Sequence, residues 1–367
     1  MPARILRFGG NGLNRENPVV LEDIRHICSD TNINWSKLTG KTVLVTGSTG
    51  LIGKLIVKAL CAKDGIHVIA MARNREKAEA CFAGYTGVEL LICDISSIPA
   101  IEARIDYIIH CASVTDSKQF VQQPVTTFLT AVNGTDQILK LAVEKQCAGV
   151  VYTSSMEVYG TPQTDEKITE QHPTNLDCMN VRACYPESKR ACENLCCAYA
   201  SQYSIPIMTA RLTQTFGAGV AYRDGRVFAE FARCAVENRN IILHTKGETK
   251  RSYLYTSDAV RAILTILTEG QSCHAYNIAN EDTYCSIYEM AQMVAQNCGS
   301  GIQVECIPED ISKFGYAAQL HMNLDTSAIR ALRWQAAYSL PQMYERMIAS
   351  WNSNEGSMQQ HEENDHF

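Results

Sequence analysis

The sequence of 367 residues has no long hydrophobic run and no excess of positive charge. Its N-terminus lacks the apolar stretch of a secretory signal, and no segment approaches the roughly 20 apolar residues that cross a bilayer. The net charge of −6 and the absence of a stripe of lysine and arginine exclude a basic footprint for nucleic acid. We therefore expect a soluble, cytoplasmic protein that binds neither membranes nor nucleic acids.

The sixteen cysteines follow no pattern of a metal or disulfide framework. No two have Cys-x-x-Cys spacing, and the nine histidines show no ligand spacing, so no metal is expected. The cysteines are scattered through apolar segments of a chain that is long enough to bury a core without disulfides. We expect reduced thiols, most of them buried.

One segment, KTVLVTGSTGLIG at residues 41–53, organises the rest of the sequence. An apolar run rich in β-branched residues meets Gly47, Gly50 and Gly53, and an apolar helical pattern follows at once. Glycines leave the backbone amides of such a turn open to a pyrophosphate, and the start of a helix favours its negative charge. The segment predicts a strand, a tight turn and a helix that bind a dinucleotide.

Apolar strands then alternate with helices. Strands are predicted over residues 67–72, 89–93, 107–111 and 150–154, and long helices over 120–145 and 184–203. Near-continuous apolar strands joined by helices are typical of a parallel sheet covered on both faces. We predict an α/β fold, a Rossmann-type doubly wound parallel sheet with a smaller C-terminal substrate-binding lobe.

The chain divides into four predicted regions. These are an N-terminal extension with one amphipathic helix (1–40), a region that is mainly the NAD(P)-binding domain (41–213), a region that is mainly the substrate-binding lobe and interleaves with the sheet (214–351), and a disordered tail (352–367). The helix of the extension should begin at Asn17-Pro18, and the tail is polar with little hydrophobicity.

The second predicted strand ends at Arg73, where dinucleotide folds often carry an acid for the adenine ribose. An arginine here accommodates a 2′-phosphate, which favours NADP over NAD. The alternative is a solvated charge at a helix start. The other predicted cofactor contacts lie in the glycine turn and after later strands: Gly47, Thr49, Gly50, Leu51, Ile52, Gly53, Asp94, Ile95, Cys111, Ala112, Ser113, Tyr185 and Lys189.

The strongest catalytic pattern is Tyr185-Pro186-Glu187-Ser188-Lys189. Tyr185 and Lys189 are four apart on one helix, so the ammonium can lower the pKa of the phenol and make it a usable base. Ser155, at the end of the fifth predicted strand, would share the proton of a substrate alcohol with Tyr185.

Six segments, in this order and spacing, carry a family resemblance: GSTGLIG, DYIIHCAS, VNGTDQIL, SSMEVYG, YPESK and ARLTQTFG. They resemble the extended short-chain dehydrogenase/reductase family, and within it the nucleotide-sugar epimerase, dehydratase and decarboxylase branch. The resemblance covers about residues 40–350. It implies that Tyr185 removes a sugar hydroxyl proton, usually at C4, while hydride passes to the nicotinamide. It also implies that Lys189 binds the nicotinamide ribose and that two long helices form a homodimer.

The resemblance extends to the nucleotide-diphosphate sugar. Arg251 lies in a segment whose family arginine contacts the diphosphate, and Gln214 stands where family members usually carry asparagine. A surface salt bridge is the alternative for Arg251. The predicted substrate contacts are Ser155, Met156, Glu157, Arg182, Gln214, Arg226 and Arg251.

Glu157 discriminates between reactions, because 4,6-dehydratases and UDP-glucuronate decarboxylases carry Glu there and simple 4-epimerases usually do not. Met156 weakens dehydration, since a thioether cannot protonate a departing C6 hydroxyl. The leading outcomes are hexuronate decarboxylation and epimerisation. The alternatives are a 4,6-dehydratase, a net NADPH-dependent keto-sugar reductase and, outside enzymes, a non-catalytic NADP(H)-binding sensor or scaffold.

Overall fold

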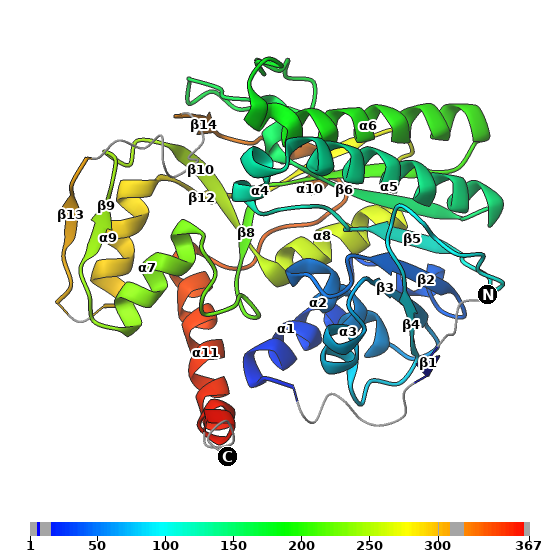
Figure 1. The fold of residues 1–367 in the computed structure, drawn as a ribbon, viewed down its shortest axis with the longest axis horizontal. Helices are drawn as coiled ribbons and strands as arrows, with labels where there is room; N and C mark the ends of the chain where they lie inside the picture. Colours follow the sequence, from blue (N-terminus) through cyan, green and yellow to red (C-terminus); the bar gives the residue numbers. More distant parts are fainter. Residues whose placement is uncertain (1–5, 8–15, 300, 309–318, 363–367) are drawn as a thin grey trace.

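A computed structural model describes residues 6–7, 16–299, 301–308 and 319–362 (Figure 1). Its main element is an eight-stranded sheet in the order β1-β4-β3-β2-β5-β6-β7-β11. All neighbouring pairs are parallel except β1 with β4. The strands are β1 (Leu6–Arg7), β2 (Thr42–Thr46), β3 (His67–Ala72), β4 (Val88–Ile92), β5 (Tyr107–His110), β6 (Gly149–Ser155), β7 (Ile207–Leu212) and β11 (Ala275–Ile278).

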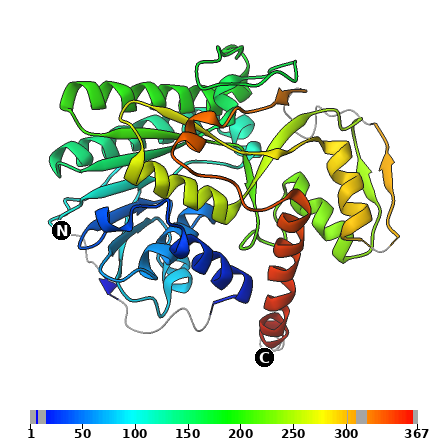
Figure 2. The same ribbon diagram turned by 180° about the vertical axis from the view of Figure 1, so that it is seen from behind.

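Helices cover both faces of this sheet, as Figures 1 and 2 show from opposite sides. Side chains alternate between the faces along β2: Val43 and Val45 join one core cluster, and Leu44 joins another. The first cluster packs under α1 (Pro18–Ser29), α2 (Leu51–Cys61), α3 (Arg75–Phe82) and α8 (Thr256–Glu269), and the second under α5 (Pro124–Glu144) and α6 (Cys184–Tyr203). The predicted α/β doubly wound fold is confirmed.

A smaller lobe is built around a third core cluster. Its central strand, β10 (Lys250–Tyr255), pairs with β8 (Gln214–Phe216), β12 (Asn280–Ser286) and β14 (His321–Met322). The lobe also contains α7 (Val227–Val236), β9 (Ile241–Leu243), α9 (Ile287–Asn297), β13 (Val304–Cys306) and the first part of α11 (Leu340–Glu362). The chain between β8 and α11 returns to the first sheet to supply α8 and β11, and α10 (Ser327–Ala331) lies beside β11.

The direction of the chain changes at the centre of the sheet. From β2 the chain builds β3 and β4 to one side, and then crosses to place β5, β6 and β7 on the other. Ligands of open parallel sheets bind outside the carboxyl ends of the strands at such a switch point. The edge beyond β2 and β5 is therefore the place to look for a functional site.

The four strands predicted after the glycine turn agree with β3, β4, β5 and β6 to within one residue at each end. The helix predicted over 120–145 is wrong as a single helix, because α4 (Ser117–Gln122) ends before Gln123 and α5 starts at Pro124. Proline disfavours a helical conformation in the residue before it, and Gln123 has φ −136° and ψ 56°. The chain therefore turns between α4 and α5.

The ends of the chain also differ from the prediction. The prediction that residues 352–367 form a disordered tail is wrong for the part up to Glu362, because α11 continues to that residue. Its first turns bury Met343, Tyr344 and Met347, and extending a helix is easier than nucleating one. Residues 363–367 lie outside the described residues. The predicted N-terminal helix is confirmed as α1, with the Asn17 side chain accepting from the backbone of Val19 at 3.0 Å.

Candidate active site

The glycine turn fits tightly against the end of β5. Gly47 has φ +62°, and a Cβ at this position would lie 2.8 Å from the backbone nitrogen of Ala112. A Cβ on Gly53 would collide with the carbonyl oxygen of Gly47. The Thr46 hydroxyl joins the two strand ends, since it accepts from the Ala112 backbone at 3.1 Å and lies 2.7 Å from His110 Nδ1. These close approaches explain why the turn requires glycine.

The other predicted cofactor residues follow the carboxyl ends of parallel strands. Cys111, Ala112 and Ser113 come after β5, Asp94 and Ile95 after β4, and Arg73 after β3, while Thr49 precedes α2, and Leu51 and Ile52 begin it. Hydrogen bonds from Ser96 and, more weakly, the charge of Arg73 hold the pKa of Asp94 below its usual range. Arg73 and Asp94 are both exposed, so this end of the crevice is open to a polar ligand.

Ser155, Tyr185 and Lys189 meet where β6 ends against the first turns of α6. Ser155 forms a hydrogen bond with the Tyr185 hydroxyl and accepts from the backbone of Glu157 at 3.2 Å. Lys189 Nζ lies 5.8 Å from the centre of the Tyr185 ring and donates to the carbonyl oxygen of Thr153 at 2.8 Å. The structure thus brings together the residue types that exchange a proton with an alcohol.

Burial dominates the electrostatics of this cluster. It raises the pKa of the Tyr185 phenol, and the Glu157 carboxylate raises it further, whereas the hydrogen bond from Ser155 and the charge of Arg182 act in the opposite direction. Burial also lowers the pKa of Lys189 to about 8. In the chain alone the pKa of the phenol therefore shifts in the direction opposite to the one expected from Lys189, because burial is the dominant influence on Tyr185.

Glu157 is paired with Arg182. Arg182 Nη1 lies 3.0 Å and Nη2 lies 3.5 Å from the two carboxylate oxygens of Glu157. The short helix η4 (Val181–Ala183) presents this arginine, and the Asn180 side chain caps it by accepting from the Arg182 backbone at 2.9 Å. Arg182 was predicted to touch substrate directly; in the structure its guanidinium holds the carboxylate.

Phe120 is a site residue that the sequence analysis missed. It lies on α4, only 2% exposed, with its ring stacked on that of Tyr185 and below the guanidinium of Arg182, whose carbon is 5.8 Å from the ring centre. A phenylalanine in an apolar helical pattern is the usual sign of core packing. The sequence held no signal that would place it beside Tyr185.

Met156 connects the catalytic segment with the smaller lobe. Its sulfur lies 3.3 Å from the hydroxyl of Thr213, which donates to the carbonyl oxygen of Ser252 at 2.6 Å. Gln214 follows Thr213 and Arg251 precedes Ser252, so each of these predicted substrate residues is adjacent in sequence to one of the two residues that connect with Met156. Within the described chain, the buried Nε of Arg251 has no hydrogen-bond partner, which leaves it available to an anionic ligand.

Arg226 is placed differently from the other predicted substrate residues. It precedes α7 and is bound to Asp224 through its Nε at 2.9 Å and its Nη2 at 2.6 Å. Its guanidinium also covers the ring of Phe228, at 4.8 Å from the ring centre. Among the contacts of the described residues, none joins Arg226 to the tyrosine cluster.

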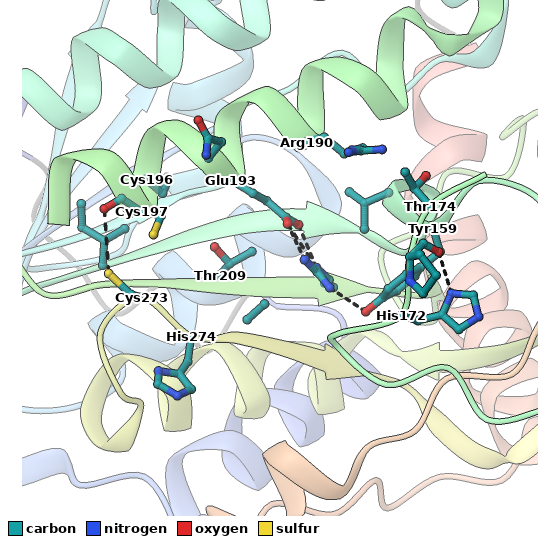
Figure 3. Close-up of a pocket in the computed structure, with 16 residues that line it drawn as sticks. Tyr159, His172, Thr174, Arg190, Glu193, Cys196, Cys197, Thr209, Cys273 and His274 are labelled. Atoms are coloured by element: carbon teal, nitrogen blue, oxygen red, sulfur yellow. Dashed lines mark hydrogen bonds and ion pairs between the residues drawn. The ribbon is translucent and has the colours of Figure 1, made fainter. Parts of the chain in front are cut away.

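A pocket of about 420 Å³ lies on the other side of α6, between this helix, β7 and the start of β11 (Figure 3). The ion pair of Glu193 with Arg211, 2.6 Å between Oε2 and Nη2, crosses its floor. Ser155, Glu157, Tyr185 and Lys189 are not among its lining residues. This pocket is separate from the tyrosine cluster.

Within the described residues, no helix is long and apolar enough to pass through a bilayer. The same part of the chain contains no cluster of three or more potential metal ligands.

The fold has a glycine turn at the switch point and a cluster of serine, tyrosine and lysine. These features are typical of α/β proteins that depend on a dinucleotide. The profile of the NAD dependent epimerase/dehydratase family matches residues 43–279, and the chain belongs to this family. The resemblance drawn from the motifs is thereby confirmed.

Several relatives carry the name UDP-glucuronic acid decarboxylase. Decarboxylase 6 of Arabidopsis thaliana is 30% identical over 275 residues, which are 73% of this chain and 78% of the relative. Decarboxylase 1 of Xenopus tropicalis is 29% identical over 273 residues, 73% of this chain. The chain spans only 63% of the length of this second relative.

Solved structures share the fold at low sequence identity. The epimerase Mth375 of Methanothermobacter thermautotrophicus superposes with a TM-score of 0.74 at 22% identity, covering 94% of this chain and 98% of the other. The UDP-glucose 4-epimerase of Thermotoga maritima, solved with UDP-glucose, superposes with a TM-score of 0.73 at 18% identity, covering 85% and 99%. These likenesses support the architecture.

Proposed function

We propose that this protein is an NAD(P)-dependent enzyme that modifies a nucleotide-diphosphate sugar through transient oxidation at C4, with decarboxylation of a UDP-hexuronate as the leading outcome. The observation that carries the proposal is the hydrogen-bonded pair of Ser155 and Tyr185 beside the carboxylate of Glu157. The names of the relatives support the uronic acid and the uridine nucleotide. Epimerisation through the same ketone is the second outcome.

The residues present fit a dinucleotide, because Gly47, Gly50 and Gly53 let the backbone turn tightly from β2 into α2 at the switch point, where a pyrophosphate approaches the start of the helix. When bound, NAD(P) supplies the acceptor for the C4 hydride and later the donor that returns it. At the end of β3, Arg73 stands where NAD-binding folds often carry an acid for the adenine ribose, and this favours NADP. Lys189 is placed to bind the nicotinamide ribose once its ammonium leaves the Thr153 carbonyl.

In the proposed reaction, the phenolate form of Tyr185 accepts the proton of the C4 hydroxyl, and Ser155 forms a hydrogen bond to the reacting oxygen. The ketone makes the C5 carboxylate a β-keto acid, so carbon dioxide leaves and its bonding electrons pass into the enolate. A proton is then added at C5, and the ketone is reduced again at C4. Glu157, held by Arg182, is placed to control the proton at C5.

Met156 argues against dehydration, since its buried thioether carries no proton for a leaving hydroxyl. Net reduction of a keto-sugar by NADPH is a second candidate, and Arg73 is the observation that favours it. A recycling enzyme returns its cofactor unchanged, whereas a reductase consumes one NADPH for each sugar. A non-catalytic binder would have no use for a serine and a tyrosine that together can exchange a proton with an alcohol.

A panel of UDP-, dTDP-, GDP- and CDP-sugars that includes UDP-glucuronate and UDP-galacturonate tests the proposal, with the sugar protons followed by NMR. Loss of the C5 carboxylate, with release of carbon dioxide and no net change of NAD(P)H, is the expected result. The Tyr185→Phe variant should bind cofactor normally and leave every sugar unchanged. If cofactor-loaded wild-type protein alters no sugar in the panel, the proposal is wrong.

We also propose a homodimer in which α5 and α6 of two chains form a four-helix interface. Val125 and Leu129 on α5 are 68% and 48% exposed, an unusual state for apolar residues on a helix of this length. Sedimentation at micromolar concentration tests the proposal. A monomer at this concentration would contradict it.

A further inference from the structure

Two cysteines from separate parts of the fold come together at one end of the pocket behind α6, where the Cys273 sulfur approaches Cys197 (Figure 3). Cys197 lies on α6, and Cys273 lies in the turn between α8 and β11. The Cys273 thiol donates to the backbone carbonyl oxygen of Cys197 at 3.9 Å, and both residues line the pocket. Seventy-six positions separate them in the sequence, so the contact is made by the fold.

The turn that carries Cys273 is held firmly. Cys273 has φ +61°, an uncommon conformation for a residue with a side chain, and its backbone donates to the carbonyl oxygen of Ile207 at 2.8 Å. In return, the Ile207 backbone donates to the hydroxyl of Ser272 at 3.3 Å. These bonds to the start of β7 fix the direction in which the Cys273 side chain points.

Both thiols are open to solvent, which sets them apart from most cysteines of this chain. Cys178 and Cys306 are the other exposed cysteines, and each lies in a different part of the fold. Cys196, the neighbour of Cys197, is buried at 2% exposure and faces the core. The pocket, about 420 Å³ in volume, gives a small molecule room to approach the pair.

We propose that Cys197 and Cys273 form a modification site, a dithiol that is reversibly converted into an intramolecular disulfide by exchange with a small disulfide such as oxidised glutathione. One thiolate attacks the small disulfide, forms a mixed disulfide and releases one small thiol. The second thiolate then attacks the protein sulfur and releases the other small thiol. Two protein thiols are oxidised, one small disulfide is reduced to two thiols, and the protons pass to solvent.

The bond would join α6, whose first turns carry Tyr185 and Lys189, to the turn that begins β11. The neighbouring Cys273 side chain is the first cause of a raised pKa of the Cys197 thiol. Only the thiolate attacks a disulfide, so the exchange should be slow at neutral pH and accelerate as the pH rises from 7 to 9. We therefore expect both thiols to be mostly protonated and to react slowly at neutral pH.

The test uses full-length protein in which the two lone exposed thiols are replaced, Cys178→Ser and Cys306→Ser. After incubation with oxidised glutathione, the intact mass should fall by about 2 Da, with a peptide that links Cys197 to Cys273. Dithiothreitol should restore the original mass. Adding Cys197→Ser or Cys273→Ser should convert the product into a stable glutathione adduct, a rise of about 305 Da.

Three results would overturn the proposal. These are glutathione adducts on the parent protein with no loss of mass, a disulfide that links two chains on a non-reducing gel, and a peptide map that pairs either thiol with another cysteine. None of these readouts depends on sugar chemistry, so the outcome stands apart from that of the proposed function.

Discussion

Phe120 lies face to face with Tyr185, with the ring centres 4.3 Å apart and the ring planes inclined by 8°. The two residues come from α4 and α6, and Phe120 itself is held between the tyrosine and the guanidinium of Arg182. A phenol that exchanges a proton with substrate must keep its oxygen within hydrogen-bond reach. The stack fixes the tilt of the Tyr185 ring, and we assign Phe120 a positioning role.

Replacing Phe120 by leucine should lower kcat by roughly tenfold or more, because small misplacements of a reacting group are costly. KM and the binding of cofactor should change little, since Phe120 is not part of the glycine turn. Phe120→Tyr keeps the stacked ring and serves as the matched control, with kcat close to wild type. Equal loss of kcat in both variants would contradict the positioning role.

The ion pair of Glu157 and Arg182 leads to a second prediction. Glu157→Gln removes the proton-carrying group but keeps a hydrogen-bond partner for Arg182, and it should reduce kcat by about a hundredfold or more. If Arg182 acts only by holding Glu157, adding Arg182→Gln to this variant should cause little further loss. Steady-state kinetics of the single and double variants measure the coupling.

Arg226→Gln is the control for this cycle. Arg226 is bound to Asp224 and shares no described contact with Glu157, so its effect should multiply with that of Glu157→Gln. If the losses of kcat from Arg182→Gln and Glu157→Gln also multiply in the double variant, Arg182 does not act through Glu157.

Patterns that depend on local sequence predicted the fold well. The glycine turn and the apolar strands were found because glycine spacing and apolar runs are patterns of residues close together in the sequence. The break between α4 and α5 could also have been predicted, since Pro124 disfavours a helical conformation at Gln123. Both features are properties of neighbours in the chain.

Contacts between distant residues were beyond the sequence. Arg182 was predicted only as a substrate contact and Phe120 was not predicted as a site residue, because their relation to Glu157 and Tyr185 depends on how α4, η4 and β6 are packed. The pKa of the tyrosine could not be read from its spacing to Lys189, because the dominant influence is the burial that the whole fold imposes. How far a side chain is removed from water by tertiary packing cannot be recognised from the residues next to it in the sequence.

Arg73 gives a third prediction, on the choice of cofactor. Arg73→Asp should lower the preference for NADP over NAD by about tenfold or more, because the carboxylate repels a 2′-phosphate and accepts hydrogen bonds from a free ribose. Titration of both dinucleotides by fluorescence measures the ratio. Arg75→Asp, at an exposed position two residues later, is the control. An unchanged ratio in Arg73→Asp would show that Arg73 does not select the cofactor.

A fourth prediction concerns Asp23, which joins the N-terminal helix to the rest of the fold. This carboxylate on α1 is fully buried, and it accepts from the Tyr255 hydroxyl and from Arg346 Nη2, both at 2.9 Å. Burial raises the pKa of Asp23 to about 6, although Arg346 and Tyr255 oppose the shift. The folded chain therefore keeps this proton to higher pH than the unfolded chain does.

The sign of the effect on stability follows from this difference. Between about pH 4 and pH 6 the unfolded chain loses the proton first, so the free energy of unfolding decreases as the pH rises and then stays level. Asp23→Asn removes the titration. Its stability relative to wild type should therefore improve by about 1 kcal/mol between pH 5 and pH 7.5, as measured by urea unfolding. Glu22→Gln, at the exposed neighbouring position, should show no such change. A constant difference between Asp23→Asn and wild type across this range would mean that Asp23 is ionised in the folded chain throughout.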